Sequence, residues 1–538
     1  MIRDRLRALE LATRPVHPDT EEALERRWAE LPPHAKHDGQ MLGRRTVGCE
    51  GTHGVFPRCN LACTPCYHSR DANRVRIDGP HTISEIDAQM ALLRRRRGPG
   101  QYAQLIGGEV TLLSPEDHAE ALAVMRRHGR KPMSMSHGDF DYEYLERLAI
   151  GPDGKPRFES LSFAGHFDSM MFGRRGIKRA RRETDLHEYR ERFCVMFARL
   201  EREHGVKSYL AHNMTVTPRN LDQIGEVVRA CRFMGFRMFS FQPAAFVGNR
   251  SRWKDDYREL TGDAVWREIE RGAGGRLAYR TIQIGDVRCN RTAYGVYVGE
   301  RYHNLLDDRD SRDLAARDAF VDSFGGMDFG HPPARLAAKL ARVCTHRPRS
   351  LGVGARWAGR FMQRAGLVPL VRHGVRPITF VMHSFMDAGV VRPAWEGMQR
   401  GELSDEPEVR ATQERLQACS YAMAHPESGE LVPACVQHSV LDPAENLKLQ
   451  ELRPLALRSF ASRGTRPASA PTSSAGPRAG GMPSTRIALR PSESFSRPSL
   501  EPTSSPVRSR TRSSRYRIVW RWVKSFEAVP ATLPSASR

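Results

Sequence analysis

The run Cys59-Asn60-Leu61-Ala62-Cys63-Thr64-Pro65-Cys66-Tyr67 places three cysteines in one short segment, with the spacing C-x3-C-x2-C. Three thiolates on one tight loop can hold three irons of a [4Fe–4S] cube and leave the fourth iron without a protein ligand. An open iron can bind a small molecule and act on it, whereas a cluster held by four cysteines mostly carries electrons. A zinc knuckle or a small structural iron–sulfur site would use the same residue type, so the surrounding sequence has to decide.

Around this loop the chain alternates between apolar runs and helical patterns. The stretch Thr46 to Phe56 is rich in glycine and turn residues, a helix is expected to begin near Ser84, and another opens at Ser114 with a cap, a proline and two acids. The expected strands are Ala103–Ile106, Met133–Met135, Leu161–Ala164, Tyr209–Val216 and Met238–Phe241. Strands alternating with helices predict a parallel sheet, whose active face lies at the carboxyl ends of the strands.

Polar residues gather at those predicted strand ends: Glu109, His137, Asp139, His166, Asp168, Asn213 and Gln242. The first strand after the cysteine loop ends in Gly107-Gly108-Glu109. Two glycines let the backbone approach a ligand closely, and the carboxylate beside them can accept hydrogen bonds from a ligand ammonium group. The pattern therefore predicts a binding site for a small charged molecule beside the cysteine loop.

Cys59, Cys63 and Cys66, followed by Gly107-Gly108-Glu109, resemble the radical S-adenosylmethionine (radical SAM) superfamily in order and spacing, over about residues 45–250. The resemblance implies an α/β fold, a partial (β/α)6 TIM-like barrel, and a [4Fe–4S] cluster that chelates SAM. An electron donor such as flavodoxin or ferredoxin would reduce the cluster and cleave SAM. The resulting 5′-deoxyadenosyl radical would abstract hydrogen from a small organic substrate.

The resemblance also implies roles for individual residues. Gly107, Gly108 and Glu109 would lie along the methionine part of SAM. The candidates for holding its ribose and carboxylate are His166, Asp168 and Asn213. One position departs from the family, which often has an aromatic residue just before the third cysteine: here it is Pro65, and Tyr67 follows the cysteine instead. No catalytic residue is assigned.

A weaker resemblance covers the C-terminal half, from His383 through Cys419 to Cys435. It is similar to the end of radical SAM enzymes that methylate pterin precursors or join lipid chains in archaea, and it implies methylation or C–C bond formation. The four late cysteines would then hold an auxiliary [4Fe–4S] cluster: Cys289, Cys344, Cys419 and Cys435. Alternatively some of them are buried, inert thiols, as Cys194 and Cys231 in helical patterns are expected to be.

The composition predicts four segments. They are an N-terminal helical extension (1–44), the core barrel (45–250), a C-terminal α/β accessory domain (251–455) and a disordered basic tail (456–538) rich in Ser, Pro and Arg. The tail carries +12 of the net charge of +22, so the basic balance is weak evidence for a nucleic-acid partner. Because no apolar start and no run of eighteen apolar residues is present, we expect no transmembrane segment and a cytoplasmic protein.

Two other functions stay open on the sequence alone. One is a nucleic-acid-binding protein with a structural metal site and a basic arm, which does not account for Gly107-Gly108-Glu109 or for the alternating strands and helices. The other is an iron–sulfur electron carrier, in which the cluster would be fully ligated by protein and indifferent to SAM.

Overall fold

The computed structural model describes residues 2–68, 71–248, 253–324 and 333–455. Its centre is an eleven-stranded sheet in the order β10-β9-β11-β8-β7-β5-β4-β3-β1-β12-β13, and a second sheet pairs β2 with β6. The strands are β1 (Cys49–Gly51), β2 (Ala62–Cys63), β3 (Tyr102–Leu105), β4 (Lys131–Ser136), β5 (Ser160–His166), β6 (Met171–Phe172), β7 (Lys207–Val216), β8 (Met238–Pro243), β9 (Asn290–Val298), β10 (Arg301–Asn304), β11 (Arg376–His383), β12 (Tyr421–His425) and β13 (Glu430–Pro433).

The middle of the large sheet is parallel. From β12 through β1, β3, β4, β5, β7 and β8 to β11 every neighbouring pair runs in the same direction, while β9, β10 and β13 add antiparallel edges. The predicted α/β class and parallel sheet are confirmed. The parallel series continues beyond the predicted strands, because β11 and β12 from the C-terminal half extend it at both ends. Both sides of the predicted domain boundary at residue 250 thus share one sheet, and the tail lies outside the described residues.

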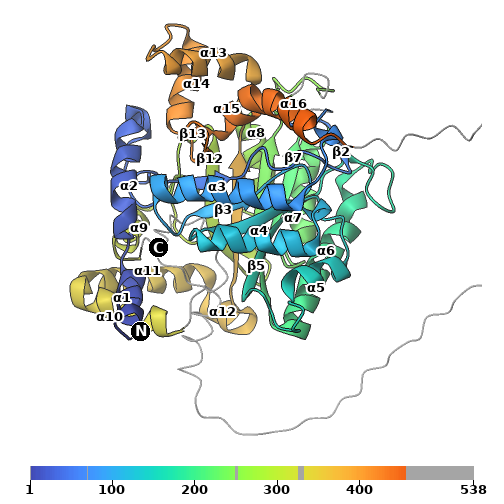
Figure 1. Cartoon of the computed structure of the whole chain (residues 1–538). Helices are drawn as coiled ribbons and strands as arrows, with labels where there is room; N and C mark the ends of the chain where they lie inside the picture. Colours follow the sequence, from blue (N-terminus) through green and yellow to red (C-terminus); the bar gives the residue numbers. More distant parts are fainter. Residues whose placement is uncertain (1, 69–70, 249–252, 325–332, 456–538) are drawn as a thin grey trace, which may run out of the picture. The chain divides into compact units, whose positions relative to one another are not determined.

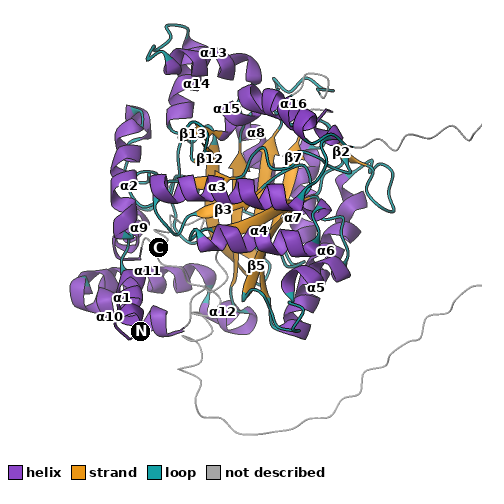
Figure 2. Ribbon diagram, in the orientation of Figure 1, coloured by secondary structure: helices purple, strands orange, loops and turns teal. Residues whose placement is uncertain are grey.

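Helices cover the sheet on the outside, as Figure 2 shows. Successive helices of the central series pack on one another: α3 (Gly79–Arg97), α4 (Pro115–Arg127), α5 (Tyr142–Ala149), α6 (His187–His204), α7 (Ile224–Cys231) and α8 (Gly262–Ala273). The helix predicted to begin near Ser84 begins at Gly79 instead, because the side chain of Asp78 caps it by accepting a hydrogen bond from the His81 amide at 3.1 Å. The predicted cap at Ser114 is confirmed.

The remaining helices come from the two ends of the chain. The N-terminal extension forms α1 (Ile2–Thr13) and α2 (Pro18–Glu30), as its charged pattern predicts. The C-terminal half adds α9 (Ser311–Phe324), α10 (Pro333–His346), α11 (Pro348–Ala365), α12 (Leu367–His373), α13 (Ala388–Gln399), α14 (Pro407–Gln417), α15 (Ala434–Val436) and α16 (Asp442–Leu452). Among the helices of the described residues, none combines the length and the apolar character needed to cross a lipid bilayer.

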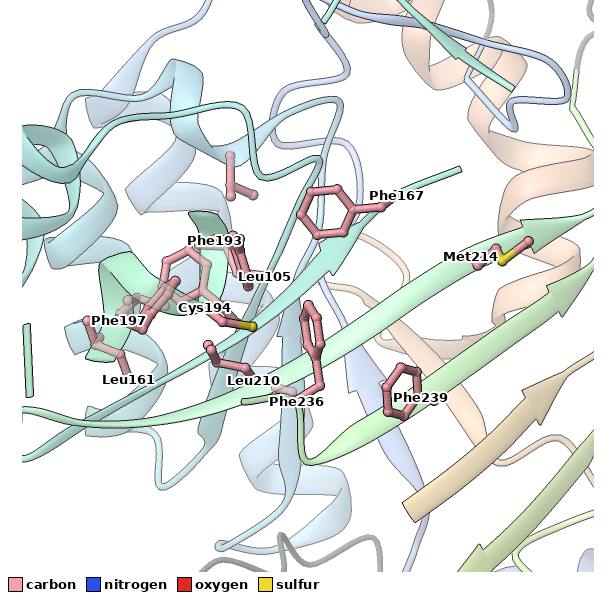
Figure 3. Close-up of a cluster of buried hydrophobic side chains, with 14 of the residues drawn as sticks. Leu105, Leu161, Phe167, Phe193, Cys194, Phe197, Leu210, Met214, Phe236 and Phe239 are labelled. Carbon is pink, nitrogen blue, oxygen red and sulfur yellow. The ribbon is translucent and has the colours of Figure 1, made fainter. Parts of the chain in front are cut away.

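Aromatic side chains fill the space between α6 and the sheet (Figure 3). Phe193 and Phe197 project from α6 with their ring centroids 5.1 Å apart, and Phe193 meets the edge of Phe167 at 5.6 Å. All three rings are fully buried. Cys194 and Cys231 are also buried, which confirms their predicted place in the core. This packing holds the carboxyl ends of β5 and β7 in place.

A buried ion pair anchors β1, the strand that leads into the cysteine loop. The carboxylate of Glu50 is completely buried and accepts from Arg130 at 2.9 and 3.1 Å, with Arg97 3.5 Å away. Removal of Glu50 would leave two buried guanidinium groups without their carboxylate, which is strongly destabilising. Because one of these residues is glutamate and the strand is only three residues long, the sequence pattern gave no strand here.

Candidate active site

The cysteine loop leaves β1, turns through Cys59 and Cys63, and is fixed by hydrogen bonds on both sides. The amide of Cys59 donates to Asn73 Oδ1 at 3.0 Å, and the amide of Thr64 donates to the carbonyl of Met170 at 3.2 Å. Cys63 lies in β2, which pairs with β6. All three cysteines of the motif, Cys59, Cys63 and Cys66, are half-buried on this one loop. The predicted thiol set therefore lies beyond the carboxyl end of β1, as a ligand site in a parallel sheet should.

The glycine pair that follows β3 packs against the chain just before Cys59. A Cβ placed on Gly108 would lie 2.0 Å from the carbonyl oxygen of Arg58, and one on Gly107 would lie 2.7 Å from the carbonyl oxygen of Phe56. The amides of Gly108 and Glu109 donate to these same two carbonyls, each at 2.9 Å. The two glycines are therefore required because two backbone segments touch, and they set the path of the chain into the cysteine loop.

The carboxylate of Glu109 is buried and saturated with hydrogen bonds. Its Oε1 accepts from the Thr111 amide at 3.0 Å, the Thr111 hydroxyl at 2.6 Å and the Ser136 hydroxyl at 2.7 Å, and its Oε2 accepts from the His137 amide at 2.8 Å. Four donors of the protein leave it little capacity for a ligand. In this structure Glu109 ties the end of β3 to the end of β4.

His137 connects that network to the cysteine loop. Its Nδ1 accepts from the Asp139 amide at 2.9 Å, so its Nε2 carries the proton and donates to Asn60 Oδ1 at 2.8 Å. Burial lowers the pKa of His137, which keeps the ring neutral near pH 7. Asn60 follows Cys59 directly, so His137 orients the loop from the sheet side.

His166, Asp168 and Asn213 are brought together by the pairing of β5 and β7, in which His166 faces Asn213. His166 Nε2 lies 2.7 Å from Asp168 Oδ2 and 3.1 Å from the hydroxyl of Thr215. Burial alone would raise the pKa of Asp168, but the charge and hydrogen bond of His166 and the amides of Thr215 and Met170 outweigh it and lower the pKa. The three residues form one polar group at the carboxyl edge.

Arg174 is a site residue that the sequence pattern does not indicate, because it lies in an irregular loop outside any motif. Its guanidinium is buried, 5.0 Å from the ring of Phe167 and 5.5 Å from that of Tyr189, and its Nη2 donates to the carbonyl of His166 at 3.2 Å. Its Nη1 is buried without a hydrogen-bond partner among the described residues. Burial lowers the pKa of Arg174. An unsatisfied buried donor of this kind costs about 1–3 kcal/mol, which an anionic ligand would recover.

A basic hollow of about 590 Å³ borders the cysteine loop. Its lining is Ser169, Met170, Lys178, Arg179, Ala180, Arg181 and Arg219. Met170 also accepts the hydrogen bond from Thr64, which places the hollow against the loop. Arg219 pairs with Asp255, and the guanidinium of Arg179 lies over the ring of Phe172 at 5.2 Å. The volume is within the range of small-molecule sites, and the lining is strongly cationic.

The late cysteines are brought together only in part. Burial raises the pKa of Cys435, and its neighbours Cys419 and Cys289 raise it further, so these three thiols lie near one another. The side chain of Arg415 donates to Cys289 Sγ at 3.1 Å. Cys344, by contrast, is exposed on α10, whose main neighbours are α1 and α11.

The thiol that the sequence analysis left out of this group is Cys49. Burial raises its pKa to about 11, and Cys419 is among the charges that act on it. The sheet brings the two residues near one another, because β1 pairs with β12 and the Cys49 amide donates to the carbonyl of Ser420 at 2.7 Å. Cys49 and Cys419 are 370 positions apart in the sequence, so no spacing rule could have joined them.

Comparison with known proteins gives little guidance. No family model matches the chain, and no curated protein matches it significantly. Among solved structures, Streptococcus suis SuiB bound to precursor peptide SuiA is 16% identical, over 37% of this chain and 39% of that chain, with a TM-score of 0.25. Native anSMEcpe with bound AdoMet is 15% identical, over 41% of this chain and 57% of that chain, with a TM-score of 0.28. The chain thus spans about half the length of these proteins, and scores of this size assign neither fold nor activity.

Proposed function

We propose that the protein is a radical SAM enzyme, which binds a [4Fe–4S] cluster and SAM and abstracts hydrogen from a small organic substrate. The observation that carries the proposal is the arrangement of Cys59, Cys63 and Cys66 on one half-buried loop at the carboxyl edge of a parallel sheet. The loop is braced where it begins by Gly107 and Gly108. Three thiols with that spacing match a cluster that keeps one iron open.

The residues around the loop fit the charged groups of SAM. Arg174 presents a buried donor without a partner among the described residues, which suits the carboxylate of the methionine part. His166, Asp168 and Asn213 offer donors and acceptors suited to a ribose. When bound together, the reduced cluster and SAM supply a 5′-deoxyadenosyl radical, the species that removes a hydrogen atom from an unreactive carbon.

The chain's own residues orient the cysteine loop. His137 and Glu109 hold Asn60, and with it the cysteine loop, in a fixed position relative to the sheet. Because the neutral His137 ring donates from Nε2, it keeps this hold without adding a charge beside the thiols. Glu109 thus acts as a positioning residue in this proposal, and the contact with the methionine part falls to the backbone at Gly107 and Gly108.

The basic hollow gives the substrate a chemical class. Lys178, Arg179 and Arg181 favour a substrate that carries a carboxylate or phosphate, while the fourth cation of the lining, Arg219, is already paired with Asp255. The reaction that follows hydrogen abstraction, including methylation or C–C bond formation, is not defined by these residues. A small acidic electron carrier such as flavodoxin or ferredoxin would supply the electron.

An auxiliary iron–sulfur cluster is the second part of the proposal. The charge effects of Cys289 and Cys419 on Cys435, and of Cys419 on Cys49, support a ligand set in which Cys49 takes the position that the sequence analysis gave to Cys344. The Cys435→Ala protein is expected to lose about half of its iron after reconstitution, since each such cluster holds about four irons. The matched control is Cys344→Ala, which should keep its full iron content. Equal iron in both variants would remove the auxiliary cluster and leave the first one untouched.

Electron paramagnetic resonance tests the open iron directly. The cluster of the reconstituted protein is reduced with dithionite, and spectra are taken with and without SAM. A ligand on the open iron changes the spectrum, and the Arg174→Met variant should need a higher SAM concentration for the same change. A cluster whose spectrum ignores SAM is fully ligated by protein and would support the electron-carrier alternative instead.

A further inference from the structure

Two histidines and a glutamate converge at the same edge of the sheet, apart from the cysteines. His53 follows β1, and His425 ends β12. Glu445 lies on α16 (Figure 1), which packs on the short helix at 71–74 that follows the cysteine loop. Because β1 and β12 are parallel neighbours with Gly51 facing Met423, His53 and His425 occupy matching positions two residues further along. One ligand atom from each of the three residues lies within 4.8 Å of the others.

Both imidazole rings aim the same nitrogen at the same carboxylate. The rings of His53 and His425 stack with centroids 4.1 Å apart at an interplanar angle of 28°. His53 Nδ1 lies 3.1 Å from Glu445 Oε2, and His425 Nδ1 lies 3.6 Å from Glu445 Oε1. Tetrahedral ligands held about 2.1 Å from a metal are about 3.4 Å from one another, so the observed separations bracket the required value.

The outer nitrogen of each ring is already committed to an acceptor. His53 Nε2 lies 2.7 Å from the carbonyl of Ala424, and His425 Nε2 lies 2.7 Å from Gln437 Oε1. Each Nε2 therefore carries a hydrogen and donates it. A neutral ring of this tautomer points an Nδ1 lone pair at a carboxylate oxygen, so either the ring takes up a second proton, which Glu445 favours at His53 by raising its pKa, or a metal cation lies between the two acceptors. Metal-ligating histidines typically make this outward hydrogen bond.

The orientation of the Gln437 amide is fixed by its other contacts. Its Nε2 donates to Glu445 Oε2 at 2.8 Å and to Asp442 Oδ1 at 2.9 Å, so its Oε1 must be the atom that faces His425. Asp442 is buried and bonds His438 Nδ1 at 2.6 Å. Gln437 thus holds one ligand ring and the ligand carboxylate together, and Asp442 adds a second negative charge close by.

The described residues contain one other group of this kind, and it is chemically different. Glu146, Glu203 and His204 also bring three ligand atoms within 4.8 Å, but Glu203 is exposed to solvent in part and already paired. Both its oxygens accept from Arg199 Nε, at 2.9 and 3.0 Å, and Tyr142 donates to it as well. An arginine neutralises that group, whereas within the described part of the chain no arginine or lysine forms an ion pair with His53, His425 or Glu445.

We infer that His53, His425 and Glu445 form a binding site for one divalent first-row transition metal ion, such as Zn²⁺ or Fe²⁺. Two imidazoles and a carboxylate are the donors that these ions accept, and three protein ligands leave further coordination positions open. The surroundings of the site reach the cysteine loop, because His438, which bonds Asp442, lies against Tyr67 with ring centroids 4.2 Å apart at an interplanar angle of 39°. The inference is independent of the proposed function.

Cobalt(II) titration of the full chain tests the site. The protein carries Cys59→Ala, Cys63→Ala, Cys66→Ala, Cys419→Ala and Cys435→Ala, so that neither the cysteine loop nor the proposed auxiliary group can compete, and the measurement needs neither SAM nor turnover. About one Co²⁺ per chain should bind, with weak visible bands and without the strong near-ultraviolet absorption of a cobalt–thiolate bond. In the same background His425→Ala and Glu445→Gln should each bind at least tenfold more weakly, and Gln437→Met about tenfold more weakly.

His204→Ala is the matched control and should bind cobalt unchanged, with circular dichroism confirming that every variant is folded. Cobalt binding that survives both His425→Ala and Glu445→Gln, or that shows thiolate absorption, overturns the inference and assigns the metal to other residues. Absence of binding in the folded parent also overturns it, and the cluster is then a hydrogen-bonded pair of histidines that shares protons with Glu445. None of these results bears on SAM cleavage, which is measured with the cysteines intact.

Discussion

The two groups of cysteines differ in how the fold assembles them. Cys59, Cys63 and Cys66 come from one loop, whereas Cys49, Cys289, Cys419 and Cys435 come from four separate segments of the chain. Burial raises the pKa of the Cys289 thiol to about 11, as it does for Cys49. Since the thiolate is the metal ligand, Cys49 and Cys289 must lose their protons against a raised pKa before they can bind iron. A contiguous motif such as the loop is also easier to recognise.

Removing a thiol from the loop should have the largest effect. Cys59→Ala, Cys63→Ala and Cys66→Ala each leave only two ligands, so the loop cluster should not form and SAM cleavage should fall to background. Iron and sulfide analysis after anaerobic reconstitution checks this. Cys194→Ala, a buried core thiol, is the control and should keep both properties. A Cys63→Ala protein with full cluster content would show that the loop thiols are not required for the cluster, which would contradict the role given to the loop.

Alkylation should separate the groups without any metal. At pH 8 a thiol with a pKa of about 11 has about 100-fold less thiolate than one with a pKa of 9.0, so Cys289 should react about 100-fold more slowly with iodoacetamide than an ordinary thiol. Its rate should rise with pH up to about 11, because the thiolate is lost as pH falls below the pKa. Mass spectrometry of the apo-protein follows each site. Labelling of Cys289 as fast as Cys59 would contradict the structure.

Arg174→Met tests whether the buried guanidinium beside the cysteine loop binds SAM. Hydrogen bonds to charged groups contribute about 1.5–3 kcal/mol, so SAM should bind at least about tenfold more weakly while the cluster content stays the same. Isothermal titration of the reconstituted protein measures the dissociation constant. Arg229→Met, which removes an exposed arginine from α7, is the control and should leave the affinity unchanged. Equal affinities in both variants would remove Arg174 from the site.

Gly108→Ala should have the smallest effect and tests the brace of the loop. Its Cβ would lie 2.0 Å from the carbonyl oxygen of Arg58, so the backbone before Cys59 must shift. Overpacking of this kind costs about 1–3 kcal/mol of stability, and cluster content should fall with it. Gly359→Ala on α11 meets nothing within 4 Å and should be neutral or slightly stabilising. Urea unfolding compares the two variants. Equal stability would show that the backbone before Cys59 accommodates a side chain at position 108 without cost.

Several parts of the fold could be predicted from the sequence because their signals are local. The strands β4, β5, β7 and β8 contain the apolar runs expected there, and the Ser114 cap is where its motif predicts. β1 could not be found in this way, since its charged residue Glu50 is stabilised by Arg130, which directly precedes the distant strand β4. The same holds for α3, whose start depends on Asp78 rather than on the apolar periodicity that begins later.

The candidate site likewise combines features that local sequence patterns predict with contacts that only the folded chain shows. The cysteine loop and Gly107-Gly108-Glu109 are contiguous motifs, whereas the role of Glu109 in bonding Ser136 and His137 appears only when β3 and β4 are paired. Arg174 belongs to no pattern and becomes visible as a buried, unsatisfied donor. Pairing of β1 with β12 is likewise what joins His53 to His425, across more than 370 residues. Long-range pairing, which the sequence does not encode locally, decides these contacts.

Formation of 5′-deoxyadenosine is the measurement that tests the central claim most directly. The protein is reconstituted anaerobically with iron and sulfide, reduced with dithionite and incubated with SAM, and the product is quantified by chromatography. The account predicts 5′-deoxyadenosine from the wild-type protein and none above background from the Cys59→Ala, Cys63→Ala and Cys66→Ala proteins. A fully loaded cluster that leaves SAM intact would contradict it, and the loop would then be a structural or electron-carrying site.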